Sequence, residues 1–237
     1  MDEVRGLRLR SASGVRERKL ATLLEEHGRA ADDAGLTAVV EDAQLLGSLE
    51  LAGFPVGWEQ VRESRGTGAG PDALLALRRA QGAVKPKSPL RVASLLAWHG
   101  ALAGPVGFRA GRRDRDGAPP APPELVESRL ALLETWLGGR SGQDLRPEQA
   151  AALAMARIVE VLPFDDGNGR VARLAASHVM VGGGRRPPIL VAGDGSRLVR
   201  ALDAAFRLET EPLATLLEEA SGRALDVMTQ ALEKGEL

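Results

Sequence analysis

The stretch from Pro147 to Met180 reads as two helices joined by a tight loop, PFDDGNG. Pro147 suits the first turn of a helix, because the N–H that it lacks would have no partner there. We expect that helix to run to about Leu162 and a second helix to follow Gly167. Glycine on both sides of Asn168 permits backbone conformations that other residues resist, so the chain can turn sharply here. The stretch therefore predicts a helix–loop–helix.

Most of the remaining chain also predicts helices. Ala and Leu dominate the apolar residues, which make up 44% of the sequence, while aromatic residues make up only 3%. This mixture favours helices over sheets. Periodicity and Gly/Pro breaks predict further helices at about 16–28, 36–52, within 54–61, 72–82, 89–103, 124–137, and from 196 onward with a pause near 210–212. The predicted fold class is all-α.

Two segments rich in Gly and Pro interrupt these helices. RGTGAGP, residues 65–71, is the best candidate for a linker, because both residue types oppose regular structure. GPVGFRAGRRDRDGAPPAPP, residues 104–123, is a long charged loop, and such loops inside compact chains are often functional. A short β-hairpin within 104–123 is the one place where we expect strands.

Composition argues against several classes of function. With 31 basic and 32 acidic residues the chain has no overall field to attract nucleic acid or an anionic membrane. The absence of cysteine excludes disulfides, thiolate metal sites and thiol nucleophiles. No run approaches the roughly 20 apolar residues of a membrane-spanning helix, and the N-terminus lacks the apolar core of a secretory signal. We expect a soluble cytoplasmic protein that binds neither nucleic acid nor membrane.

The loop between the two helices has the chemistry of a phosphate site. Backbone N–H groups of residues 167–169 can point into one concavity at the positive end of the following helix, and such a nest binds phosphate oxygens. Arg170 and Arg173 lie three residues apart on the first turn, so both can clamp phosphates beside it. A carboxylate at Asp166 is placed to hold a magnesium ion that bridges phosphates. A plain turn with solvated arginines is the competing interpretation.

The full string LPFDDGNGRVAR, residues 162–173, resembles the signature of the Fic family, His-Pro-Phe-x-Asp/Glu-Gly-Asn-Gly-Arg-x-x-Arg. The resemblance extends to residues 94–111, 119–137 and 185–219. It implies a Fic-type helical bundle with a short β-hairpin flap and an N-terminal helical extension. The implied division is an extension at 1–64, a Fic-like domain at 72–220 and a helical tail at 221–237.

Family members mostly transfer AMP from ATP to a protein hydroxyl and release pyrophosphate. The resemblance therefore implies that Asp166 holds Mg and that ATP or another nucleoside polyphosphate is the ligand. The residues that it assigns to phosphate binding are Gly167, Asn168, Gly169, Arg170 and Arg173. The structural anchors that it implies are Pro163 and Phe164. The flap that would pin an extended protein or peptide target by strand addition comprises Phe108, Arg109, Ala110 and Gly111, and a homodimer is left open.

The first signature position departs from the family, where a His acts as general base. Leu162 cannot accept a proton, and general-base catalysis is typically worth about 10²- to 10⁴-fold in rate. Asp165 is a weak substitute, because a neighbour in an extended loop points to the other face. His178 lies about 12 Å along the helix from Arg170, and His99 reads as a structural residue among apolar neighbours. No good replacement for the base is present.

A second departure concerns the inhibitory motif that many family members carry, Ser/Thr-x-x-x-Glu-Gly/Asn. In SLELAG, residues 48–53, Ser48 and Gly53 fit this pattern, but Ala52 stands in place of Glu. An alternative frame, TAVVED at 37–42, retains Glu41 and ends in Asp. We prefer the first frame, in which the base and the inhibitory carboxylate are both absent.

Three functional hypotheses follow. The first is a pseudoenzyme that binds a nucleotide and acts by binding or regulation. The second is a non-standard transferase whose acceptor needs no deprotonation, such as a carboxylate. The third is a protein-interaction module that uses the flap. The intact Asp166 and both arginines weigh against the third.

Overall fold

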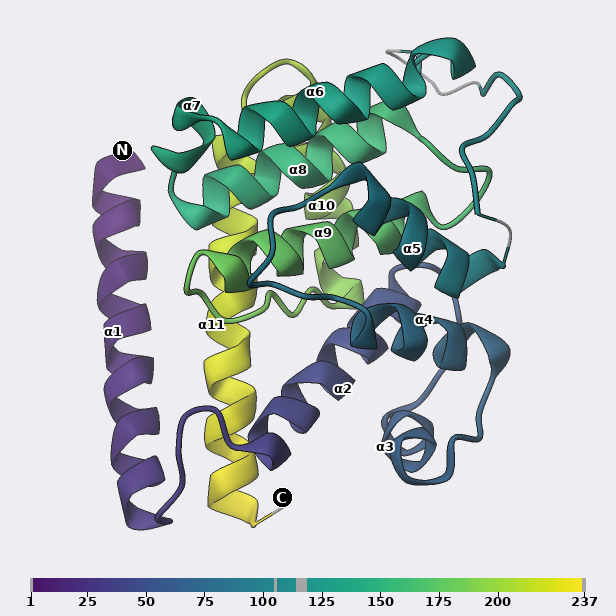
Figure 1. The fold of residues 1–237 in the computed structure, drawn as a ribbon. Coiled ribbons are helices and arrows are strands. Elements are labelled where there is room, and N and C mark those ends of the chain that lie inside the picture. The colour runs from purple at the N-terminus through teal and green to yellow at the C-terminus, as the bar shows by residue number, and fades with distance from the viewer. Residues whose placement is uncertain (1, 105, 114–118, 236–237) are drawn as a thin grey trace.

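The computed structural model describes residues 2–104, 106–113 and 119–235, and these residues form helices without a strand (Figure 1). The all-α prediction is confirmed. The first five α-helices are α1 (Asp2–Glu26), α2 (Ala34–Glu50), α3 (Trp58–Thr67), α4 (Asp72–Gly82) and α5 (Val92–Ala103). The later elements are η1 (Pro123–Leu125), α6 (Val126–Gly138), α7 (Arg140–Gln143), α8 (Pro147–Val161), α9 (Asn168–Gly182), η2 (Ala192–Asp194), α10 (Gly195–Phe206) and α11 (Glu211–Lys234).

The predicted helix–loop–helix is present as α8 and α9. Several other predicted ends are shifted. The linker expected from residue 65 begins at Gly68, because α3 continues through Gly66 and stops where Gly68 adopts a left-handed conformation with φ 65°. The pause in the C-terminal helices falls at 207–210, because Pro212 is accommodated in the first turn of α11.

The antiparallel pair α8 and α9 lies at the centre of the molecule, with α6, α10 and α11 packed on α8 (Figure 1). Both central helices present small residues, so their backbones can approach closely. The fully buried alanines of this pair are Ala151, Ala152, Ala154, Ala172, Ala175 and Ala176. The principal apolar core is built around them and holds the loop between α8 and α9 in a fixed place.

The N-terminal and C-terminal helices pack on each other. Helix α1 lies alongside α11, and α2 also contacts α11 (Figure 1). A second apolar cluster joins these three helices and is formed by Leu20, Leu24, Leu36, Val40, Ile189, Ala224, Leu225, Met228, Ala231 and Leu232. The predicted boundary after residue 220 falls inside the continuous helix α11. Residues 1, 236 and 237, the ends of the predicted extension and tail, lie outside the described residues.

A buried ion cluster joins α2 to α3 and α4. The Asp42 carboxylate is fully buried and forms ion pairs with Arg65 and Arg78, the latter at 3.0 Å. Such a carboxylate is stable only while both guanidinium groups compensate the loss of water. The cluster therefore fixes the position of α2 against the rest of the chain.

Across the described ranges, no helix combines the length and apolar character that crossing a membrane requires.

Candidate phosphate site

The loop begins with a strained residue at the end of α8. Leu162 has φ 47° and ψ 64°, a left-handed conformation, and its N–H donates to the Ile158 carbonyl oxygen over 3.0 Å. A left-handed conformation costs an ordinary L-residue roughly 1–2 kcal/mol. Histidine occurs in this region more often than most residues. The backbone at position 162 therefore has a shape that suits the family's His better than the Leu present.

The side chain of Asn168 closes the loop on itself. Its Oδ1 accepts from the Phe164 N–H over 2.9 Å, and its Nδ2 donates to the Phe164 carbonyl over 2.8 Å. Gly167 lies between them with φ 77°, in the left-handed region. A Cβ at position 167 would also meet the Arg170 side chain at 3.6 Å. The Asn168 amide is thus engaged by the loop itself, and only its backbone N–H is placed for a ligand.

The N-terminus of α9 has no side-chain cap. The helix begins at Asn168, and no side chain caps its N-terminus at Gly167. The N–H groups of the first turn have no partner within a helix, and the helix dipole adds positive potential at this end. Such unpartnered donors at the start of a helix are the groups that bind anions in proteins. Phosphate binding by residues 167–169 stays a prediction, and the uncapped start of α9 is consistent with it.

The base of the loop is anchored by aromatic packing. Phe164 is 1% exposed and stacks on His99, with ring centroids 3.9 Å apart and planes 3° apart. The Phe108 ring also stacks on the Phe164 ring, with centroids 6.0 Å apart. Burial lowers the pKa of His99, while a hydrogen bond to the Asp166 backbone opposes the shift. His99 is thus a buried residue that supports the loop through Phe164, as the sequence predicted, and Phe164 lies in the core.

Two motif side chains form an ion pair with each other. Arg170 Nη2 lies 2.7 Å from Asp166 Oδ2, and the guanidinium also lies over the Phe54 ring at 5.2 Å from its centroid. The Asp166 side chain is 83% exposed, whereas that of Arg170 is only 8% exposed. The Asp166 carboxylate is accordingly accessible to a cation, while Arg170 is held in place by its neighbours.

The second motif arginine reaches α2. Arg173 donates from Nε to Ser48 Oγ and from Nη2 to the Ser48 carbonyl, each over 2.8 Å. Burial, and secondarily the charge of Arg170, lowers the pKa of Arg173 to about 10. Within the described residues, no carboxylate lies within ion-pair distance of Arg173. Arg173 therefore carries a largely buried charge that only neutral oxygens partner.

The contact with Ser48 places the degenerate inhibitory motif against Arg173. Ala52, at the position of the family's Glu, is exposed in the turn after α2, and Gly53 follows with φ 80°. In the alternative frame, Glu41 is exposed on α2, and Asp42 is buried in its own ion cluster. The packing of α2 favours the frame that begins at Ser48.

The flap is attached to the end of α8 by a buried arginine. The Arg109 guanidinium is 3% exposed and donates to the carbonyls of Leu162 over 2.5 Å, Gly111 over 2.6 Å, Val161 over 3.3 Å and also Ala121. Its backbone N–H donates to the Pro163 carbonyl over 2.9 Å. The Arg109 side chain is thus unavailable to a target, contrary to its expected place on a docking surface. The neighbouring residues Ala110 and Gly111 are exposed.

The predicted β-hairpin is not seen in the described part of 104–123, where the backbone is irregular. One reason is local: the N–H of Arg109 is bonded to the loop after α8 instead of to a partner strand. Residues 105 and 114–118 of the predicted hairpin lie outside the described residues. Nothing in the local sequence distinguishes Arg109 from the exposed arginines that follow it, so its structural role could not be predicted.

Asp165, the weak candidate for a substitute base, faces solvent. Its side chain is 75% exposed and lies 3.4 Å from Arg113 Nη2, which also contacts the Asp165 backbone carbonyl. His178 is buried in α9 against Trp98, with ring centroids 5.6 Å apart. Among the described residues, the contacts of Asp165 and His178 hold neither side chain beside Leu162.

This geometry defines an all-helical protein in which a segment around Arg109 is tied to the loop of a central helix–loop–helix. The Fic/DOC family model matches residues 89–180. This match, together with the relatives and solved structures described next, supports a Fic family protein.

Known proteins similar to this chain include Protein adenylyltransferase Fic of Nematostella vectensis, which is 31% identical over 111 residues. That match covers 47% of this chain and 26% of the relative, so it spans about a quarter of the relative's length. Fic-1 (residues 134–508) of C. elegans has a TM-score of 0.75 at 21% identity, covering 98% of this chain and 76% of that chain. IbpAFic2 covalently tethered to Cdc42 has a TM-score of 0.51 at 15% identity, covering 88% and 70%.

Proposed function

We propose that the chain binds a magnesium complex of ATP or another nucleoside polyphosphate at the loop 166–173 and is poor or inactive in ordinary AMP transfer to hydroxyl groups. The observation that carries the proposal is Leu162 at the position of the general base, beside an otherwise intact phosphate loop. The curated relative is named as an adenylyltransferase. Retention of the loop without the base supports binding more than turnover.

The residues present fit a magnesium–polyphosphate complex. Asp166 is exposed at the lip of the cradle, and Mg²⁺ is commonly held by one or two carboxylates together with substrate phosphates. The part of the chain that the structure describes contains no group of three or more acidic or His residues that would bind a metal alone. Magnesium, when bound with the nucleotide, would neutralise phosphate charge. The chain's own part is to orient the phosphates with the N–H groups of 167–169 and with Arg170.

The missing base sets the expected loss. A hydroxyl acceptor must lose a proton as it attacks, and a positioned base is worth about 10²- to 10⁴-fold. Asp165 is directed to Arg113 and solvent, and His99 is buried behind Phe164. We therefore expect AMP transfer to fall by at least about 10²-fold relative to a form that carries the base.

Calorimetry and a gain-of-function variant test the proposal together. ATP, GTP, CTP and UTP would be titrated with and without magnesium into the native chain. Leu162→His is expected to raise AMP transfer to itself or to a test protein by about 10²- to 10⁴-fold. Leu162→Gln, which supplies a polar side chain without a base, serves as the matched control and should leave transfer at the native level. Absence of nucleotide binding by the native chain would refute the proposal.

A second candidate is a transferase whose acceptor is already ionised. A groove of about 520 Å³ next to the motif is lined by Phe54, Arg79, Asp166 and Arg170, among others. The exposed guanidinium of Arg79 gives this groove a partner for an acceptor carboxylate. Steady pyrophosphate release on addition of an acidic peptide, lost in Arg79→Gln, would support this function, whereas tight nucleotide binding without turnover would support the first.

A protein or peptide partner at the flap is a further part of the proposal. Residues Ala110, Gly111 and Arg113 are exposed there, and one protein of similar fold, IbpAFic2, has been captured with Cdc42. We propose the exposed backbone beside Ala110 as the contact with such a target. A crosslink from a photoreactive residue at position 110 to a bound protein would support it.

A further inference from the structure

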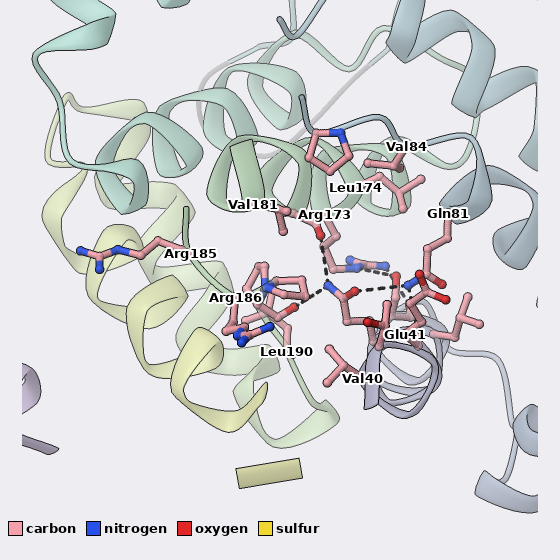
Figure 2. Close-up of a pocket in the computed structure, with 18 of the residues that line it drawn as sticks. Val40, Glu41, Gln81, Val84, Arg173, Leu174, Val181, Arg185, Arg186 and Leu190 are labelled. Carbon is pink, nitrogen blue, oxygen red and sulfur yellow. Dashed lines mark hydrogen bonds between the residues drawn. The ribbon is translucent and has the colours of Figure 1, made fainter. Parts of the chain in front are cut away.

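A cavity of about 330 Å³ lies between α2 and α9, apart from the phosphate loop (Figure 2). Of the motif residues 162–173, only Arg173 lines it, and α4 and the segment 185–190 supply other walls. Its volume lies at the lower end of the range for small-molecule pockets. The mouth is marked by the exposed residues Glu41 and Arg185.

The cavity combines apolar walls with a few polar groups. The aliphatic lining comes from all sides, with Val40 and Leu45 on α2, Leu77 on α4, and Leu174 and Val181 on α9. Such a lining with few convergent polar groups is typical of sites for small organic molecules.

The polar groups inside the cavity are already organised by hydrogen bonds. Gln44 Nε2 donates to Ser177 Oγ over 3.2 Å and to the Pro188 carbonyl over 3.1 Å, and Gln81 Nε2 donates to Gln44 Oε1 over 3.2 Å. This series of hydrogen bonds fixes the amide groups of Gln44 and Gln81 before a ligand binds. It leaves the Ser177 hydroxyl able to donate a hydrogen bond into the cavity.

Arg173 gives the cavity its charge preference. Figure 2 shows this side chain extending from α9 toward α2, where Ser48 offers it only neutral oxygens. A buried guanidinium is normally paired with an anion, because neutral partners compensate poorly for lost water. Arg185 at the mouth is already paired with Glu148 at 2.6 Å. Arg186 also lines the cavity, near its surface, and donates to the Ala31 carbonyl oxygen over 3.2 Å. Among the described residues, Arg173 and Arg186 are therefore the two cations of the lining without an ion-paired carboxylate, and Arg173 is the one held between α9 and α2.

The mouth limits the charge of a ligand. Glu41 and Asp32 both line the cavity and are exposed. Their carboxylates disfavour a second negative group at the outer end of a bound molecule. The lining thus favours one anionic group and an uncharged, apolar remainder.

We propose that this cavity binds a small carboxylic acid with an apolar body, its carboxylate on Arg173 and its apolar part against α2 and α9. The site shares Arg173 with the proposed nucleotide site, but its other lining residues lie outside the loop 166–173 and binding of the acid does not require the loop to be filled. Because a Cβ at Gly169 would lie 3.3 Å from Arg173 Nη1, the same guanidinium lies beside the loop. A bound acid would therefore connect the cavity to the loop and give α2 a regulatory ligand.

Phenylbutyrate and octanoate are suitable probes, each with its primary amide as an uncharged counterpart. Calorimetry on the full chain would measure affinity, and the Nε–H resonance of Arg173 in a ¹⁵N-correlated spectrum would report contact. We expect at least one acid to bind in the millimolar range or tighter and about tenfold more tightly than its amide, as a charge-assisted hydrogen bond predicts. The Arg173 resonance should shift with the same midpoint.

Paired variants locate the binding. Val84 lines the cavity and is half-buried, so Val84→Trp should fill the mouth and abolish binding of the acid. Val15 is 55% exposed on α1 and does not line the cavity, so Val15→Trp is the matched control and should bind normally. Arg173→Gln should equalise the affinities for acid and amide. Failure of both acids to bind, equal binding of acid and amide by the native chain, or binding that survives Val84→Trp would overturn the proposal.

Discussion

Replacement of Arg109 by Met tests whether one buried arginine holds the flap to the phosphate loop. The guanidinium is 3% exposed and serves four carbonyl oxygens, two of them in the final residues of α8 and its cap. Met fills a similar volume but leaves these oxygens without their donor. Each buried acceptor left without its donor typically costs about 1–3 kcal/mol, so the four carbonyl oxygens together predict about 3–5 kcal/mol when some of them find other partners. We expect a loss of that size in the free energy of unfolding.

Urea unfolding monitored by circular dichroism measures this loss, and thermal unfolding should show a decrease in Tm of roughly 10 °C for a chain of this size. Arg112 lies three residues further along the flap and is exposed, so Arg112→Met should change stability by no more than about 0.5 kcal/mol. If Arg109→Met unfolds within about 1 kcal/mol of Arg112→Met, the buried contacts contribute little net energy and the reasoning fails. Arg109→Lys should recover part of the lost free energy of unfolding, because lysine keeps the positive charge but lacks the planar set of donors of the guanidinium group.

Other positions give contrasting outcomes. A Cβ on Gly47 would lie 1.8 Å from the backbone carbonyl oxygen of Leu190, so Gly47→Ala should destabilise the fold by at least about 2 kcal/mol. A Cβ on Gly66 would lie in open space, so Gly66→Ala should be neutral or stabilising by up to about 1 kcal/mol. Equal effects in thermal unfolding would contradict the packing argument. Burial lowers the pKa of both His99 and His178 below the ordinary 6.5. The unfolded chain therefore binds more protons than the folded chain in acid, and the free energy of unfolding should fall as the pH drops below about 6.5. Urea titrations from pH 7 to pH 5 that show no such fall, or the same fall in a His99→Gln, His178→Gln double variant, would count against it. Asp42→Asn should cost at least about 2 kcal/mol by uncoupling α2 from α3 and α4, and a change within about 0.5 kcal/mol would show that its ion pairs contribute little.

Local sequence was sufficient for most of the helices and for the loop between α8 and α9. Proline in the first turn of α8 and the glycines around Asn168 specify where two helices meet, because they act through backbone geometry that needs no distant partner. The resemblance to the Fic signature then gave expected roles to the neighbouring residues of one short string, 162–173. Helix ends were less predictable, as at Gly68, where a helix continued through one glycine and stopped at the next.

Only the tertiary structure decided what individual charged side chains do. Arg109 and Arg112 look alike in a charged loop, yet one is buried against α8 and the other is exposed. Arg173 was expected beside phosphates, and packing of α2 also placed it at the wall of a cavity, bonded to Ser48. The physical reason is the distance along the chain over which each effect acts. Backbone propensities act over a few residues, whereas burial and charge pairing depend on segments far apart in the sequence. Ser48 and Arg173, for example, are 125 residues apart.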